Sequence, residues 1–169
     1  WLDGGDRPRG FQVTFFRLRP GLAEDNPSRF APRQLLFAHA AIADPRASTL
    51  RHAQRAARDG VGAASVSVSD TDARIRDWSL VRLAGGEYRA EVQAGSFGLQ
   101  LDCTPTQPLL LQGEQGFSRK GPAVTDASYY YSVPQLAVRG IATVEGGKLA
   151  VSGRAWLDHE WASAILPEG

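Results

Sequence analysis

The chain contains 169 residues, of which 43% are hydrophobic and 22% are charged, and its formal net charge is +1. This length suits one domain with a sizeable hydrophobic core. The balanced charge gives no broad basic surface, which argues against a nucleic-acid partner. No run approaches the roughly 20 consecutive apolar residues of a membrane-spanning helix. The single cysteine, Cys103, excludes an internal disulfide and a zinc site built from several cysteines.

Alternation of apolar and polar residues, typical of β-strands, dominates the chain. In chain order, the expected strands are residues 11–18, 34–44, 74–83, 87–94, 97–103, 128–133, 135–144 and 148–159. Glycine-containing steps separate several of these runs, and Gly146-Gly147, between the last two, is among the stronger hairpin signals. The pattern predicts an all-β protein.

One segment, residues 48–59, predicts a short helix instead. Leu50, Ala53 and Ala57 share a face at helical spacing, and Gly60 suits a helix end. Short turns join most of the expected strands, which favours an antiparallel up-and-down β-barrel that closes its own edges. A barrel of roughly eight to ten strands has an interior able to hold one small apolar ligand.

Several familiar catalytic signatures are incomplete. His159-Glu160 begins a zinc-protease HExxH motif, but the second histidine is missing and the residues lie at a strand end. The glycine-rich residues 113–122 lack the phosphate-loop pattern, and residues 95–98 lack the nucleophile elbow. The three histidines are far apart in sequence, so we expect no metal site.

Aromatic and polar residues within the expected strands are candidates for a ligand site. His39 lies in an apolar run, where an inward-facing, hydrogen-bonded core histidine is favoured over a ligand contact. Trp78 fits a core anchor and a ligand wall equally well. Alternation places Tyr129 and Tyr131 on one side and Tyr130 on the other. Tyrosines suit the wall of an apolar pocket with a polar end, although aromatic residues also favour strands in general.

The densest group of polar and aromatic residues lies near the C-terminus. By alternation, Trp156 and Asp158 share one face, and His159 and Trp161 share the other. Burial and charge shift pKa values where carboxylates and imidazoles lie beside indoles. An acid that protonates carbon must be kept neutral, and indole faces stabilise a developing cation. A strand end with scattered charges accounts for the same residues, so both interpretations stay open.

Six blocks of sequence, in order, carry a family resemblance. They are GFQVTFFR (10–17), FAHAA (37–41) with Asp44, DWSL (77–80), QG with GFSRKG (112–121), ASYYYS (127–132) and GRAWLDHEW (153–161). Together they resemble the AttH-like, carotenoid 1,2-hydratase-like family of lipocalin-related proteins.

The resemblance implies two successive lipocalin-like β-domains. Residues 1–169 would form the first, with its initial strand before Trp1, and a second β-domain of the same chain would be its partner. Family members that hydrate carotenoids protonate a terminal isoprenoid double bond, and water captures the cation without a metal or organic cofactor. His159 and Trp161 match the family's His-x-Trp pair and are the expected catalytic residues. The acidic residue of the family's Tyr-x-Asp pair would lie beyond residue 169.

The expected function is binding of an extended hydrophobic ligand, isoprenoid or polyene-like, with acid-assisted hydration of a C=C bond. The chain would then be part of a hydro-lyase that is active only with the second domain. The expected ligand-binding residues are His39, Trp78, Tyr130, Tyr131, Trp156 and Asp158. The alternatives are a non-catalytic lipid carrier or cell-envelope protein, a pericyclase-type enzyme, and a purely structural half of a two-domain body. We also expect a periplasmic location or peripheral membrane association.

Overall fold

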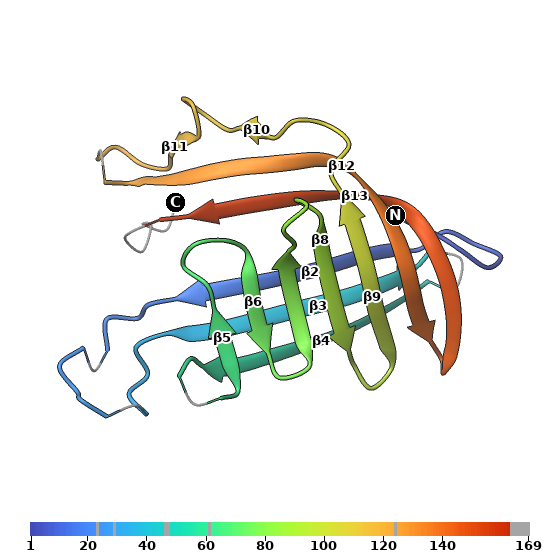
Figure 1. The fold of residues 1–169 in the computed structure, drawn as a ribbon, viewed down its shortest axis with the longest axis horizontal. Coiled ribbons are helices and arrows are strands. Elements are labelled where there is room, and N and C mark those ends of the chain that lie inside the picture. The colour runs from blue at the N-terminus through green and yellow to red at the C-terminus, as the bar shows by residue number, and fades with distance from the viewer. Residues whose placement is uncertain (23, 29, 46–47, 61, 124, 163–169) are drawn as a thin grey trace. The chain divides into compact units, whose positions relative to one another are not determined.

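The computed structural model describes residues 1–22, 24–28, 30–45, 48–60, 62–123 and 125–162. Strands, turns and loops account for all of these residues, and neighbouring strands pair antiparallel (Figure 1). The strands are β1 (Leu2–Asp3), β2 (Gly10–Leu18), β3 (Leu35–Asp44), β4 (Thr49–Arg58), β5 (Ala64–Val66), β6 (Asp72–Ile75), β7 (Trp78–Arg82), β8 (Tyr88–Gln93), β9 (Phe97–Thr104), β10 (Leu110–Leu111), β11 (Phe117–Arg119), β12 (Ala127–Val144) and β13 (Gly147–Trp161). The all-β prediction is confirmed.

The chain divides into two compact units, and β12 and β13 contribute to both. The first unit contains Trp1–Thr104 and Val138–Gly153, and the second contains Pro105–Ala137 and the chain from Arg154 onward. In the first unit, one sheet has the order β1-β13-β12-β9-β8-β7-β6-β5, and β2-β3-β4 form a separate sheet. In the second unit, β10 and β11 pair with the first part of β12.

The predicted closed barrel is not observed among the described strands, which form two sheets with free ends. The larger sheet ends in β1, with two residues, and β5, with three, and strands this short cannot continue the ladder around a ring. A pair of backbone hydrogen bonds between Leu2 and Arg9 links β1 to the start of β2. The prediction of a closed, ligand-holding barrel is therefore wrong. The first unit instead contains two sheets that face each other.

The predicted helix at residues 48–59 is wrong, because this segment forms strand β4. It pairs with β3 over its whole length, from Asp44 opposite Thr49 to Leu35 opposite Arg58. Its partly buried residues recur at every second position, namely Arg51, Ala53, Arg55 and Ala57. Alanine and arginine are strong helix formers, but the hydrogen bonds and packing supplied by β3 outweigh that weak local preference.

The predicted hairpin near residue 146 is confirmed, with its turn one residue earlier than expected. Glu145 and Gly146 occupy the two central positions with φ values of 54° and 79°. Positive φ at both positions is the signature of the type I′ turn, whose twist matches that of the paired strands. The two predicted strands 128–133 and 135–144 are one strand, β12, with Gln135 at a positive φ of 53°.

Large apolar side chains fill the interior of the first unit. Strand β8 alternates as predicted, with Tyr88, Ala90 and Val92 buried and the intervening residues exposed. The side chains with at most 2% exposure include Leu36, Ile75, Trp78, Phe97, Leu99, Leu101 and Val138. Strands β3 and β4 lie against β6, so the two sheets share this core (Figure 1). Burying each large side chain stabilises the fold by roughly 1.5–3 kcal/mol.

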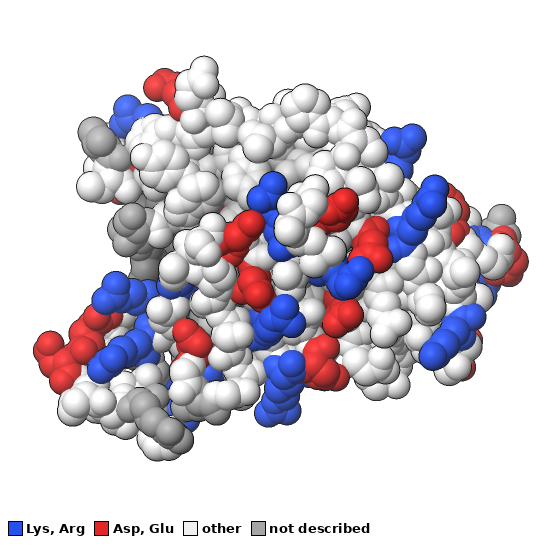
Figure 2. Space-filling model, in the orientation of Figure 1, with Lys and Arg blue, Asp and Glu red and all other residues white. Residues whose placement is uncertain are grey.

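The exposed face of strands β6 to β9 carries paired charges of both signs (Figure 2). Its ion pairs are Arg74 with Asp72, Arg82 with Asp70, and Arg89 with Asp102. Each exposed pair contributes at most about 1 kcal/mol, so these pairs favour solubility more than stability. A helix with the length and hydrophobicity needed to cross a bilayer does not occur in the part of the chain that the structure describes.

Candidate functional site

The paired strands β12 and β13 bring His159 and Trp161 together with Tyr131 in the second unit. The Tyr131 hydroxyl lies 2.9 Å from Nδ1 of His159. The ring centroids are 5.1 Å apart for Tyr131 and His159, 5.2 Å for His159 and Trp161, and 6.1 Å for Tyr131 and Trp161. Alternation places His159 and Trp161 on one face of β13, as the sequence predicts, and the pairing of β12 with β13 adds Tyr131 to that face.

Two further rings extend this face. Tyr129 stacks on Trp161 at 5.7 Å with 22° between the ring planes, and Phe117 from β11 meets Tyr129 edge-on at 5.9 Å. Tyr129 is 53% exposed and Trp161 is 48% exposed. The aromatic cluster, which we define as Phe117, Tyr129, Tyr131, His159 and Trp161, therefore presents a half-exposed apolar surface with one imidazole in it.

Polar side chains occupy the opposite face of the same two strands. Asp158 accepts hydrogen bonds from Ser132 Oγ at 2.6 Å and from Trp156 Nε1 at 2.8 Å. Glu160 accepts a hydrogen bond from Ser128 Oγ at 2.5 Å and lies 2.7 Å from Lys120 Nζ. We call these residues, with Tyr130, the polar cluster. The Lys120 ammonium also lies 5.5 Å from the centroid of the Tyr130 ring.

The polar cluster keeps both of its carboxylates ionised. Burial raises the pKa of Asp158, but hydrogen bonds from Ser132, Trp156 and Tyr130 outweigh it and leave that pKa below its ordinary value. The pKa of Glu160 is lowered by Lys120 first and then by Ser128. The pKa of Tyr130 is raised, chiefly by its hydrogen bond to Asp158, so the phenol stays protonated at neutral pH. Neither carboxylate matches a buried, neutral acid able to protonate carbon.

Trp78 and His39 belong to the first unit. Trp78 is 1% exposed, its Nε1 donates a hydrogen bond to the Gln93 carbonyl oxygen at 2.8 Å, and the Arg55 guanidinium lies 4.7 Å from its ring centroid. These contacts favour the core-anchor interpretation. His39 is exposed and meets Phe16 edge-on at 5.3 Å.

The inward orientation predicted for His39 is wrong. The buried face of β3 consists of Leu36, Ala38, Ala40, Ile42 and Asp44. Both faces of this strand are rich in apolar residues, so the alternation gives no clear choice between them.

Of the other predicted site residues, Tyr131, His159 and Trp161 lie on one face of β12 and β13, and Tyr130, Trp156 and Asp158 lie on the opposite face.

Several members of the two clusters are not among the residues predicted from the sequence. Tyr129 shares a face with Tyr131 by simple alternation, and the same rule assigns Ser128 and Ser132 to the side of Tyr130. Phe117 and Lys120 come from a separate segment whose pairing with β12 has no local signal. Within the described ranges, no group of three or more His, Cys, Asp or Glu side chains is arranged to hold a metal ion.

The sequence model of the AttH-like family matches residues 1–169. The chain belongs to the AttH-like family. This confirms the resemblance carried by the six sequence blocks. No curated protein matches the AttH-like chain at a significant level.

Two solved structures resemble the AttH-like chain. An AttH protein from Nitrosomonas europaea is 47% identical with a TM-score of 0.86, and the match covers 98% of this chain and 50% of that one. Kievitone hydratase from Nectria haematococca is 13% identical with a TM-score of 0.69, and the match covers 94% of this chain and 44% of that one. The second similarity concerns the fold alone. The AttH-like chain spans half the length, or less, of both solved proteins.

Proposed function

We propose that the AttH-like chain uses its aromatic cluster to bind an extended hydrophobic ligand, isoprenoid or polyene-like. The observation that carries this proposal is the half-exposed surface of Tyr129 and Trp161 around His159. Aromatic faces exposed in this way provide a large contact area for an apolar chain, and the imidazole adds one polar contact. The family membership and the hydratase fold of one structural relative support a role of this kind.

We further propose that the whole protein hydrates a C=C bond of this ligand. Protonation of one alkene carbon leaves a cation on the other, the oxygen of water forms the new C–O bond, and the resulting oxonium loses one proton to a base, which leaves the alcohol. In this scheme Trp161 faces the developing cation and His159 orients or deprotonates the water. Because Asp158 and Glu160 are ionised, the proton donor is proposed to come from a second β-domain.

The binding proposal can be tested with cis-parinaric acid, a fluorescent polyene, and the whole protein that carries this chain. Trp161→Leu should weaken binding about tenfold, since truncating a central aromatic anchor typically costs more than 1 kcal/mol. Trp156→Leu is a matched control, because Trp156 lies on the same strand, is 53% exposed and belongs to the polar cluster on the opposite face. Equal losses for the two variants, or no saturable binding by the wild-type protein, would contradict the proposal.

Hydration can be tested with lycopene, an acyclic carotenoid, by mass detection of one added water. His159→Ala should abolish turnover while binding of cis-parinaric acid stays within about twofold. A carrier is the second candidate, favoured by the ionised state of both cluster carboxylates. Saturable binding without turnover of any polyene would support the carrier and overturn the hydratase.

A further inference from the structure

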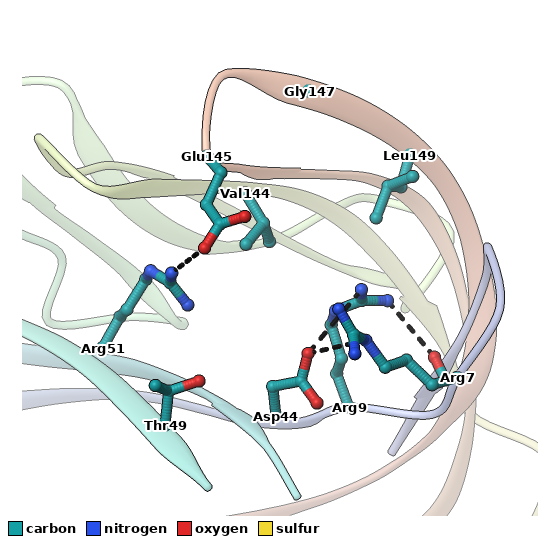
Figure 3. Close-up of a pocket in the computed structure, with 9 residues that line it drawn as sticks. All are labelled: Arg7, Arg9, Asp44, Thr49, Arg51, Val144, Glu145, Gly147 and Leu149. Carbon is teal, nitrogen blue, oxygen red and sulfur yellow. Dashed lines mark hydrogen bonds and ion pairs between the residues drawn. The ribbon is translucent and has the colours of Figure 1, made fainter. Parts of the chain in front are cut away.

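A small cavity lies in the first unit, where three chain segments meet. It has a volume of about 100 Å³ and is lined by Arg7, Arg9, Asp44, Thr49, Arg51, Val144, Glu145, Gly147 and Leu149 (Figure 3). These residues come from the segment before β2, the facing ends of β3 and β4, and the β12–β13 hairpin. Three of the nine lining residues are arginines, and the close-up shows Arg51 across the cavity from the group formed by Arg7, Arg9 and Asp44.

Two of these arginines share one buried carboxylate. Arg9 is 6% exposed and Asp44 is 7% exposed. The Nε atom of Arg7 lies 2.8 Å from Oδ2 of Asp44, and Nη2 of Arg9 lies 3.9 Å from the same oxygen. Nη1 of Arg9 donates hydrogen bonds to the carbonyl oxygens of Gly4 and Arg7. Asp44 is thus the one buried carboxylate of the described lining residues.

Two guanidinium nitrogens at this place are buried without an acceptor. The Nε atoms of Arg7 and Arg9 are both inaccessible to solvent and make no hydrogen bond in the structure. Arg7 Nε and Oδ2 of Asp44, 2.8 Å apart, form an ion pair without a hydrogen bond. A buried donor without an acceptor is costly, and a donor that belongs to a cation is more so.

The third arginine is held by an exposed carboxylate. Arg51 forms an ion pair with Glu145, whose side chain is mostly exposed and whose φ of 54° is uncommon for a residue other than glycine. Oδ1 of Asp6, a residue that is also mostly exposed, lies 3.6 Å from Nε of Arg7 and 4.0 Å from Nη2 of Arg9. Solvent weakens the contribution of both exposed carboxylates. Among its described lining residues, the cavity therefore has three guanidiniums and one buried carboxylate.

We propose that this cavity binds a small oxyanion, either inorganic phosphate or a carboxylate group. The planar guanidinium group of arginine matches the geometry of both anions and can donate hydrogen bonds to two of their oxygens at once. A cavity of about 100 Å³ holds roughly three waters at ~30 Å³ each, which suits such a group. The volume is too small for an extended apolar ligand, so this site is separate from the one proposed at the aromatic cluster.

Calorimetric titration of the whole protein tests the proposal, with inorganic phosphate in one arm and acetate in the other at constant ionic strength. Saturable binding is expected in at least one arm, and the arm with the lower dissociation constant identifies the anion. Arg51→Gln should weaken binding about tenfold. Glu145→Gln should tighten it several-fold, because it releases Arg51 from its ion pair while keeping the shape of the turn residue.

The controls carry the same charge changes on exposed strand residues away from the lining, namely Arg139→Gln for the loss of a cation and Glu91→Gln for the loss of an anion. Both should leave the dissociation constant within about twofold. In ¹H–¹⁵N spectra, the Nε–H signals of Arg7 and Arg9 should shift on anion addition, while that of Arg89, bonded to Asp102, should not. The absence of saturable binding in both arms, or equal effects of the control and cavity variants, would overturn the proposal.

Discussion

The Tyr131 hydroxyl lies 2.9 Å from Nδ1 of His159, although 28 positions separate the two residues in the sequence. The pairing of β12 with β13 makes them neighbours, so the sheet itself orients the imidazole. A neutral imidazole has one donor nitrogen and one acceptor nitrogen, and this contact therefore links the tautomer of His159 to the phenol.

Tyr131→Phe removes this contact and keeps the ring. In the proposed hydration, a general base contributes roughly 10²–10⁴-fold, and we expect loss of its positioning partner to lower kcat about tenfold with little change in KM. Steady-state assays with lycopene across a range of pH give both values. Tyr129→Phe is the control, since it removes a hydroxyl from the same face. An unchanged kcat and pH profile for Tyr131→Phe would contradict the positioning role.

Trp78→Phe should destabilise the protein by about 2 kcal/mol, because a buried indole and its hydrogen bond to Gln93 are lost. Affinity for cis-parinaric acid should not change, since a side chain that is 1% exposed presents no surface to a ligand. Urea unfolding and fluorescence titration check the two expectations. A weaker affinity with an unchanged unfolding free energy would favour the ligand-wall interpretation instead.

The stability of the second unit should depend on pH through Asp158 and Glu160. Both pKa values are lower in the folded state than in the unfolded chain, so the unfolded state binds more protons as the solution becomes acidic. This stability is fully present above the ordinary carboxyl pKa of about 4 and is lost as the pH falls through the lower folded-state values. Solvent screening keeps each contribution below about 1 kcal/mol.

Glu160→Gln tests this pH dependence. Urea unfolding at pH 7 and at pH 3.5, the latter chosen to lie just below the ordinary value, should show a smaller acid-induced loss for Glu160→Gln than for the wild-type protein. Glu91→Gln, at an exposed position of β8, should retain the full loss. Identical acid-induced losses for the wild-type protein and Glu160→Gln would show that the Lys120–Glu160 pair contributes nothing measurable.

Gly153→Ala should destabilise the first unit, because a Cβ at this position would lie 1.9 Å from the Trp1 carbonyl oxygen. Strand β1 pairs with β13 at Gly153 and would have to move away. We expect a loss of about 1–3 kcal/mol in the unfolding free energy. Gly95→Ala is the control, since its Cβ meets nothing within 4 Å. Equal stability of the two variants would show that β1 adapts without cost.

Alternation predicted the two faces of β12 and β13 correctly. The same rule failed at His39, where apolar residues occupy both sides of β3 and burial is decided by the second sheet. Residues 48–59 have good helix formers, and only the pairing with β3 makes them a strand. The barrel predicted from the sequence is not closed because the larger sheet ends in two very short strands, β1 and β5. The sequence analysis did not predict either strand. The pairs Lys120–Glu160 and Arg51–Glu145 join distant segments and have no local sequence signal.

The turn at Glu145 and Gly146 has a consequence for how this protein tolerates insertions. Because side chains alternate along a strand, one extra residue in β13 would exchange its two sides and present Asp158 and Glu160 where His159 and Trp161 now lie. Deletions or insertions of two residues would keep each side chain on its present face and would only shift the aromatic residues of β13 along β12. Natural length variation in this hairpin should therefore occur in even steps.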